Sequence, residues 1–186
     1  MQQPNVPNYT LVTTLGDSGA GKTTLARAMA RLFAERGVAS APRLVRQGAY
    51  DAEVFELRWG PSRVYQHVDF ASDAGRHALF GSAGFSAVIM AISAVDGILD
   101  GTRQSLELAR AAGIGAVVVA LTKCDLLEDV EILELVEVEV RDLFASVGLG
   151  GHQGPTIVRC VGMHTGDRRA AQAIDALFSA LEPLFY

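Results

Sequence analysis

The chain alternates short apolar runs with longer amphipathic stretches. Apolar runs of strand length lie at residues 9–15, 86–93, 115–121 and 156–161. Apolar residues recur at helical spacing in residues 22–36, 102–112, 130–147 and 168–184. Nearly continuous apolar strands are typical of parallel sheets that are covered by helices. The alternation therefore predicts an α/β fold, with a doubly wound, mostly parallel sheet and helices on both of its faces.

Two further stretches need separate interpretation. Residues 54–59 and 64–70 flank a Gly60-Pro61 turn and predict a β-hairpin, with Asp69 at the end of its second strand. Residues 135–140 alternate apolar and acidic side chains like a strand, but they lie inside a longer stretch of helical length. We predict a helix there and interpret its acidic side chains as a solvated face.

Length and composition limit the classes of function. The 186 residues suit a single domain spanning residues 1–186, with residues 1–8 flexible. A net charge of −5 provides no broad basic surface for nonspecific nucleic-acid binding. The sequence shows neither a membrane-spanning run nor a signal peptide, and its two cysteines are Cys124 and Cys160. These features predict a cytoplasmic protein with reduced thiols.

A glycine-rich segment stands between the first predicted strand and the first predicted helix. It reads Gly16-Asp17-Ser18-Gly19-Ala20-Gly21-Lys22-Thr23 and fits the G-x-x-x-x-G-K-[ST] pattern. In this pattern backbone N–H groups and the helix N-terminus face a phosphate, the Lys adds positive charge and the Thr hydroxyl ligates Mg²⁺. An ordinary glycine turn is the alternative, but it would not need Lys and Thr at these positions. The candidate phosphate-binding residues are Asp17, Ser18, Gly19, Ala20, Gly21, Lys22, Thr23 and Thr24.

A second segment, after the predicted strand at residues 115–121, indicates which base is bound. Thr122-Lys123-Cys124-Asp125 stands where a GTPase carries its N-K-x-D motif. Asp125 would accept two hydrogen bonds from the ring and exocyclic N–H groups of guanine, which adenine does not offer in that arrangement. An Asp that caps the following acidic helix is the alternative interpretation. The candidate base-binding residues are Thr122, Lys123 and Asp125.

With these segments identified, the chain resembles the G domain of bacterial elongation factor Tu from Thr10 to Pro183. The similarity is carried by Tyr65-Gln66-His67-Val68-Asp69, Val95-Asp96-Gly97, Thr102-Arg103-Gln104, Lys123-Cys124-Asp125-Leu126 and residues 133–141. The resemblance implies binding of GTP and GDP, with Mg²⁺ held by Thr23 and Asp69. It also places Val161, Gly162 and Met163 where the family has its guanine-capping S-A-L loop.

Departures from the family pattern bear on hydrolysis and affinity. The Thr of the family's switch I corresponds to Tyr50, and its D-C-P-G-H segment corresponds to Asp69-Phe70-Ala71-Ser72-Asp73. The family's water-orienting His is therefore missing, with Asp73 near its position. The catalytic residue is unknown, and we expect slow or absent GTP hydrolysis. Thr122 replaces the usual Asn and residues 161–163 replace S-A-L, so we also expect weaker guanine binding.

Three functions are open at this point. The first is a guanine-nucleotide-binding protein with weak intrinsic GTPase activity. The second is a non-enzymatic pseudo-GTPase that mimics the elongation-factor surface and binds a translation-related or regulatory protein. The third is a P-loop phosphotransferase, since the glycine loop also resembles those of some small-molecule kinases. The two β-barrel domains of the family have no counterpart in these residues, so we do not expect direct tRNA binding.

Overall fold

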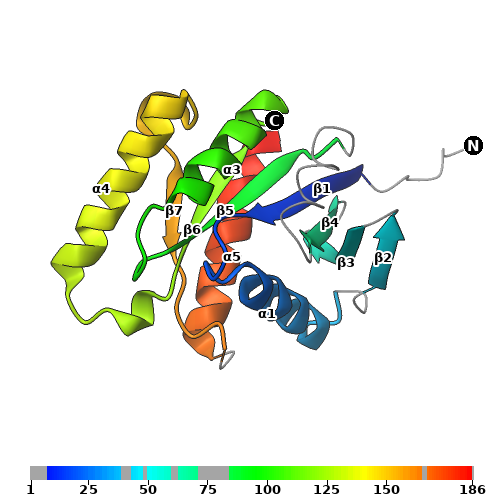
Figure 1. Ribbon diagram of the computed structural model, residues 1–186. Helices are drawn as coiled ribbons and strands as arrows, with labels where there is room; N and C mark the ends of the chain where they lie inside the picture. Colours follow the sequence, from blue (N-terminus) through cyan, green and yellow to red (C-terminus); the bar gives the residue numbers. More distant parts are fainter. Residues whose placement is uncertain are drawn as a thin grey trace, which may run out of the picture.

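The computed structural model describes residues 8–38, 43–47, 50–59, 63–70, 84–164 and 167–185. Within these residues one sheet of seven strands has the order β2-β3-β4-β1-β5-β6-β7 (Figure 1). The strands are β1 (Asn8–Leu15), β2 (Arg43–Gln47), β3 (Tyr50–Trp59), β4 (Arg63–Phe70), β5 (Ala87–Ser93), β6 (Val117–Thr122) and β7 (Thr156–Arg159). Of the terminal segment predicted to be flexible, Asn8 begins β1, and the remainder lies outside the described residues.

The sheet is mostly parallel, as predicted. Strands β4, β1, β5, β6 and β7 pair in parallel, whereas β2, β3 and β4 pair antiparallel. The predicted hairpin is formed by β3 and β4, and β3 begins at Tyr50, earlier than the sequence pattern indicates. The pattern does not predict β2, because this short strand begins with Arg43, contains Arg46 and has no continuous apolar run.

Helices cover both faces of the sheet, which confirms the predicted fold class. They are α1 (Lys22–Glu35), α3 (Asp100–Ala111), α4 (Val130–Val147) and α5 (Arg168–Leu181). Figure 1 shows α1 near α5 and α3 near α4, and each pair is in contact. Side chains of α1 and α5 enter one hydrophobic core, and those of α3 and α4 enter the other. None of the helices within the described ranges has the length and apolar character needed to span a membrane.

Two predicted boundaries at the C-terminal end are wrong. The last helix was expected to reach Leu184, but α5 ends at Leu181 and a 3-10 turn (Glu182–Phe185) follows. Pro183 explains this end, because proline has no N–H group and its ring clashes with the preceding helical turn. Strand β7 stops at Arg159 rather than Val161, because Gly162 at φ 66° turns the chain away from the sheet.

The acidic segment at residues 135–140 is helical, as predicted, and forms the middle of α4. The buried side chains of α4 follow helical spacing, at Leu133, Val136, Val140, Leu143, Phe144 and Val147. The acidic side chains are not all solvated, because Glu137 accepts a hydrogen bond from Arg159 Nε at 2.6 Å. Packing against the sheet therefore decides the conformation of a segment whose local pattern alternates like a strand.

Candidate functional site

Three loops meet at the edge of the sheet where β1, β6 and β7 end. The glycine-rich segment leaves β1 after Leu15, Thr122 closes β6, and residues 160–164 follow β7. In doubly wound folds ligands bind at the carboxyl ends of the strands, where consecutive loops approach each other. The candidate residues of these three loops therefore lie at one edge because of the sheet order.

The phosphate loop, residues 16–23, depends on glycine at specific positions. Gly16 has φ 136°, and a Cβ placed there would overlap the backbone carbonyl oxygen of Ala91 in β5. Gly21 has φ 85° and forms the N-cap of α1 without a side-chain cap. The leading N–H groups of a helix have no partners within the helix. They are therefore available to an anion held by the loop.

Lys22, the first residue of α1, folds back across the phosphate loop. Its Nζ donates hydrogen bonds to the carbonyl oxygens of Gly16 at 2.9 Å and Asp17 at 2.5 Å. These contacts close the loop and place an ammonium group over it. A positive charge and a helix N-terminus thus lie together, as phosphate recognition requires.

Thr122 ties the phosphate loop to the end of β6. Its Oγ1 donates to the carbonyl oxygen of Ala20 at 2.8 Å and approaches that of Ile92 at 3.2 Å. The side chain is buried, and it also lies next to Gly21, whose added Cβ would meet Thr122 Oγ1 at 3.5 Å. Thr122 therefore sets the distance between the phosphate loop and the segment that follows β6.

The segment after β6 has an unusual backbone at Lys123. This residue has φ 57°, in the left-handed region, and leads into the 3-10 turn η1 (Cys124–Leu126). Lys123 Nζ donates to Asp96 Oδ2 at 2.8 Å. That hydrogen bond, with a second one involving Ser93, lowers the pKa of Asp96. This hydrogen bond orients the side chain of Lys123 along the loop. Asp125, two residues further on, is exposed.

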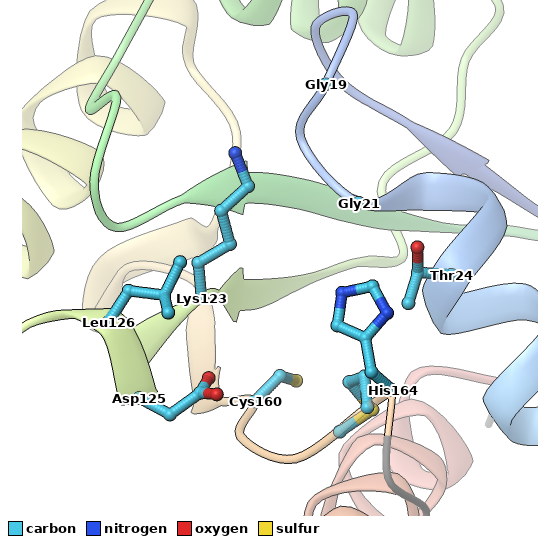
Figure 2. A pocket seen from close by; sticks show the side chains of 9 residues that line it. Gly19, Gly21, Thr24, Lys123, Asp125, Leu126, Cys160 and His164 are labelled. Carbon is cyan, nitrogen blue, oxygen red and sulfur yellow. The ribbon is translucent and has the colours of Figure 1, made fainter.

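A cavity of about 390 Å³ lies between these loops (Figure 2). Figure 2 shows Lys123, Asp125 and Leu126 on one side, His164 and Thr24 on the other, and the phosphate loop above them. Ligand cavities in proteins span roughly 300 to 1,000 Å³. The lining residues are Gly19, Gly21, Thr24, Lys123, Asp125, Leu126, Cys160, Met163 and His164.

Six of the sequence-predicted site residues line this cavity: Gly19, Gly21, Thr24, Lys123, Asp125 and Met163. The others surround it from the loops. Ser18 and Thr23 are exposed, Ala20 and Thr122 are buried, and Asp17 contacts Thr102 in α3. Val161 is partly buried, and Gly162 is buried against α5, where an added Cβ would lie 2.7 Å from Asp167 Oδ1. Gly162 therefore lets the loop pass beside the residue that caps α5.

Sequence reasoning missed three lining residues, Leu126, Cys160 and His164. Each directly follows or precedes a predicted site segment, so a wider window around the two motifs would have included them. Cys160 and Cys124 are both free and buried. Burial raises the pKa of the Cys124 thiol to about 11, and burial also raises that of Cys160. Both side chains are therefore neutral packing groups near neutral pH.

Some predicted residues are described only in part or not at all. Asp69 lies in β4 directly after Val68, which pairs with Thr13 of β1, so its backbone reaches the edge that carries the phosphate loop. The structure describes the backbone of Asp69 and of Tyr50 but not their side chains. Ala71, Ser72 and Asp73 lie outside the described residues.

Comparison with known proteins identifies the family. The sequence model for the elongation factor Tu GTP binding domain matches residues 66–183. The chain belongs to this family. It is 35% identical over 184 residues to elongation factor Tu 2 of Streptomyces avermitilis, an alignment that covers 92% of this chain and 47% of that protein. The chain thus spans about half the length of this curated relative. The predicted resemblance to the elongation factor Tu G domain is confirmed.

Proposed function

We propose that the chain binds GDP and GTP in the 390 Å³ cavity and hydrolyses GTP slowly or not at all. One observation carries the proposal: the phosphate loop and the Thr122–Asp125 segment, about a hundred residues apart in sequence, line one cavity of suitable size. Membership of a GTP-binding domain family supports the same ligand. On this proposal residues 1–186 form one nucleotide-binding domain.

Base selection is proposed to rest on Asp125. Its exposed carboxylate belongs to the short turn η1 and lines the cavity opposite His164 (Figure 2). An ionised carboxylate only accepts hydrogen bonds, and guanine presents two adjacent N–H donors on one edge. Leu126 and Met163 supply apolar surface for the faces of a flat base. Adenine has no matching pair of donors, so ATP should bind less tightly.

The phosphates are proposed to lie along residues 16–24. Three features support this placement: the uncapped N-terminus of α1, the ammonium group of Lys22 held across the loop, and the glycine backbone at Gly19 and Gly21. Backbone N–H groups, a helix dipole and one cation together favour an anion at this point. On this proposal the Lys22 side chain turns from the loop carbonyls toward a bound phosphate.

A Mg²⁺ ion is proposed to arrive with the nucleotide and to be held by Thr23 and Asp69. Thr23 is exposed as the second residue of α1, and the backbone of Asp69 ends at the same edge of the sheet. A hydroxyl and a carboxylate are hard oxygen ligands, and Mg²⁺ is often bound by one or two such groups together with substrate phosphates. The ion would neutralise phosphate charge when bound, while Thr23 and Asp69 fix its position.

Slow or absent hydrolysis is proposed from the sequence of residues 69–73. The family's water-orienting His is replaced near Asp73, and an aspartate there would repel the phosphates rather than orient a water molecule. Tyr50 in place of the switch-I Thr removes a small hydroxyl ligand. Bound GTP would then persist, and a protein of the translation machinery or a regulatory protein would recognise the GTP-bound form.

Calorimetric titration of nucleotide-free protein tests the proposal. GDP, a non-hydrolysable GTP analogue and ATP are added separately, with and without Mg²⁺. We expect binding of both guanine nucleotides, a Mg²⁺-dependent gain for the GTP analogue, and at least about 100-fold weaker binding of ATP. Asp125→Ala should abolish the preference for guanine, whereas Glu139→Gln, on the exposed side of α4, should leave it unchanged.

The same titration separates the alternatives. Preference for ATP would overturn the proposal in favour of a phosphotransferase. If GDP, the GTP analogue and ATP all fail to bind, the proposal is overturned in favour of a pseudo-GTPase that acts through its outer surface. If guanine nucleotides bind, phosphate release under single-turnover conditions then measures hydrolysis. A rate typical of an efficient GTPase would contradict the part of the proposal that rests on residues 69–73.

A further inference from the structure

The phosphate loop contains a carboxylate, that of Asp17, although its proposed ligand is an anion. Hydrogen bonds hold both the backbone and the side chain of this residue. The backbone carbonyl oxygen of Asp17 accepts a hydrogen bond from Lys22 Nζ at 2.5 Å. Its side-chain Oδ2 accepts a hydrogen bond from the hydroxyl of Thr102, which lies 85 residues away in sequence and is buried in α3.

Asp17 is directed at the first turn of α3. The N-cap residue of this helix is Leu99, which makes no side-chain capping hydrogen bond. A Cβ added to Gly101 would overlap Asp17 Oδ1, so the carboxylate occupies the space beside the first turn. A negative charge is favourable at a helix N-terminus, where N–H groups lack partners within the helix. Asp17 therefore adds a second carboxylate, from a distant loop, beside the first turn of α3, which already carries Asp100.

We infer that Thr102 is a positioning residue for nucleotide binding. It holds the carboxylate of Asp17 against α3 and away from the bound phosphates. This inference rests on the proposed function. Without the Thr102 hydroxyl, the Asp17 side chain is free to rotate within a loop that surrounds negative charge, and repulsion between like charges a few ångströms apart is strong where water is partly excluded. Gly101 is part of the same arrangement, because a larger residue would displace the carboxylate.

A positioning role and a purely structural role of Thr102 predict different effects on nucleotide affinity. Repulsion grows with the charge of the ligand, so loss of the Thr102 hydroxyl should matter least for a monophosphate and most for a triphosphate. A general loosening of α3 or of the loop would weaken all three nucleotides by a similar factor. The ratio of affinities along the series GMP, GDP and GTP analogue is therefore the decisive quantity.

The experiment compares five variants with the wild-type protein in Mg²⁺-free buffer of low ionic strength. Thr102→Val removes the hydroxyl with little change of shape, and we expect about tenfold weaker binding of GDP, a larger loss for the GTP analogue and a loss of less than about threefold for GMP. Thr102→Ser should restore wild-type affinities. Ser105→Ala removes another buried hydroxyl of α3 and should change none of them.

The fourth variant, Asp17→Asn, tests the charge itself. An Asn side chain still accepts the Thr102 hydrogen bond but carries no charge, so we expect GDP affinity at least equal to that of the wild type. In the double variant Asp17→Asn/Thr102→Val, the loss caused by Thr102→Val should disappear. If Thr102→Val does not fold, a tenfold loss in Asp17→Asn alone would overturn the inference. Equal losses for all three nucleotides in Thr102→Val would also overturn it. Wild-type protein that binds no guanine nucleotide would instead contradict the proposed function.

Discussion

Thr122 Oγ1 donates a hydrogen bond to the carbonyl oxygen of Ala20 at 2.8 Å, joining two residues 102 positions apart. The contact fixes the phosphate loop relative to the segment that we propose to bind the base, because Thr122 ends β6 and directly precedes Lys123. On the proposed assignment of residues 122–125 to the N-K-x-D motif, this contact explains how threonine can occupy the place of the usual Asn. A short hydroxyl side chain reaches the loop from the buried end of the strand.

Thr122→Val should therefore separate the two halves of the site. The variant leaves the buried carbonyl of Ala20 without this donor, so we expect the free energy of unfolding to fall by about 1 to 2 kcal/mol. We also expect about tenfold weaker GDP binding. Urea unfolding and calorimetry measure the two effects. Thr122→Ser retains the hydroxyl and serves as the control. Unchanged GDP affinity in Thr122→Val would show that the tether does not position the loop.

Asp125→Asn should change the preferred base from guanine to xanthine. Guanine then loses an acceptor for one of its N–H groups, and we expect GDP affinity to fall on the order of 100-fold. Xanthine carries a carbonyl oxygen where guanine has its exocyclic amine, and the Asn amide can donate to that oxygen. Competition between GDP and xanthosine diphosphate measures the exchange. A variant that keeps its preference for GDP would place base recognition elsewhere.

Gly16→Ala should be far more damaging than Gly19→Ala. Both glycines have positive φ, but a Cβ at Gly16 would overlap the backbone oxygen of Ala91, whereas a Cβ at Gly19 meets nothing within 4 Å. We expect a loss of about 1 kcal/mol in the free energy of unfolding for Gly19→Ala, from the backbone conformation alone. The loss for Gly16→Ala should be about 3 kcal/mol or more, because β1 and β5 must separate. Thermal or urea unfolding of both variants provides the comparison, and equal losses would contradict the close approach to Ala91.

His67 should make the protein sensitive to mild acid. Complete burial lowers its pKa to about 3, and its Nε2 lies 2.9 Å from Thr14 Oγ1. In the unfolded chain the imidazole of His67 takes up a proton below about pH 6.5, but in the folded chain it takes up that proton only near pH 3. The contribution of neutral His67 to the free energy of unfolding is therefore fully present above about pH 6.5. It is lost as pH falls, by roughly 1 kcal/mol per pH unit.

Urea unfolding of the wild type and of His67→Gln at pH 7.5 and 5.5 isolates this contribution. Carboxylates titrate equally in both proteins, so the difference between their pH dependences belongs to His67. We expect the wild type to lose roughly 1 kcal/mol more than the variant over this interval. The same loss in both would mean that folding does not hold His67 neutral.

Much of the fold follows from local sequence. Continuous apolar runs predict β5 and β6, whose residues are all buried, and helical spacing predicts α1, α3, α4 and α5 within a few residues. The edge strand β2 is not predicted, because Arg43 and Arg46 give it no apolar pattern. A strand of this kind is recognised only through its backbone pairing with β3.

Some residues of the candidate site are likewise predicted from local sequence, whereas others are not. The order of glycine, lysine and threonine in residues 16–23 predicts a phosphate loop, because the chemistry of that loop needs these residue types at fixed spacing. Asp125, which lines the cavity, is predicted for the same reason, and its role in base binding stays a prediction. Cys160 and His164 carry no such local requirement, and they join the cavity only because β7 lies beside β6.

The sequence by itself therefore determined the α/β class and the phosphate loop, since backbone conformation and motif spacing are local properties. The base-binding role of residues 122–125 stays a prediction. Only the tertiary structure decided which distant residues hold these loops in place. Thr122 reaches Ala20, Lys123 reaches Asp96, and Thr102 reaches Asp17. These contacts depend on the order of strands in the sheet, and sequence spacing contains no information about which side chains that order brings within hydrogen-bonding distance.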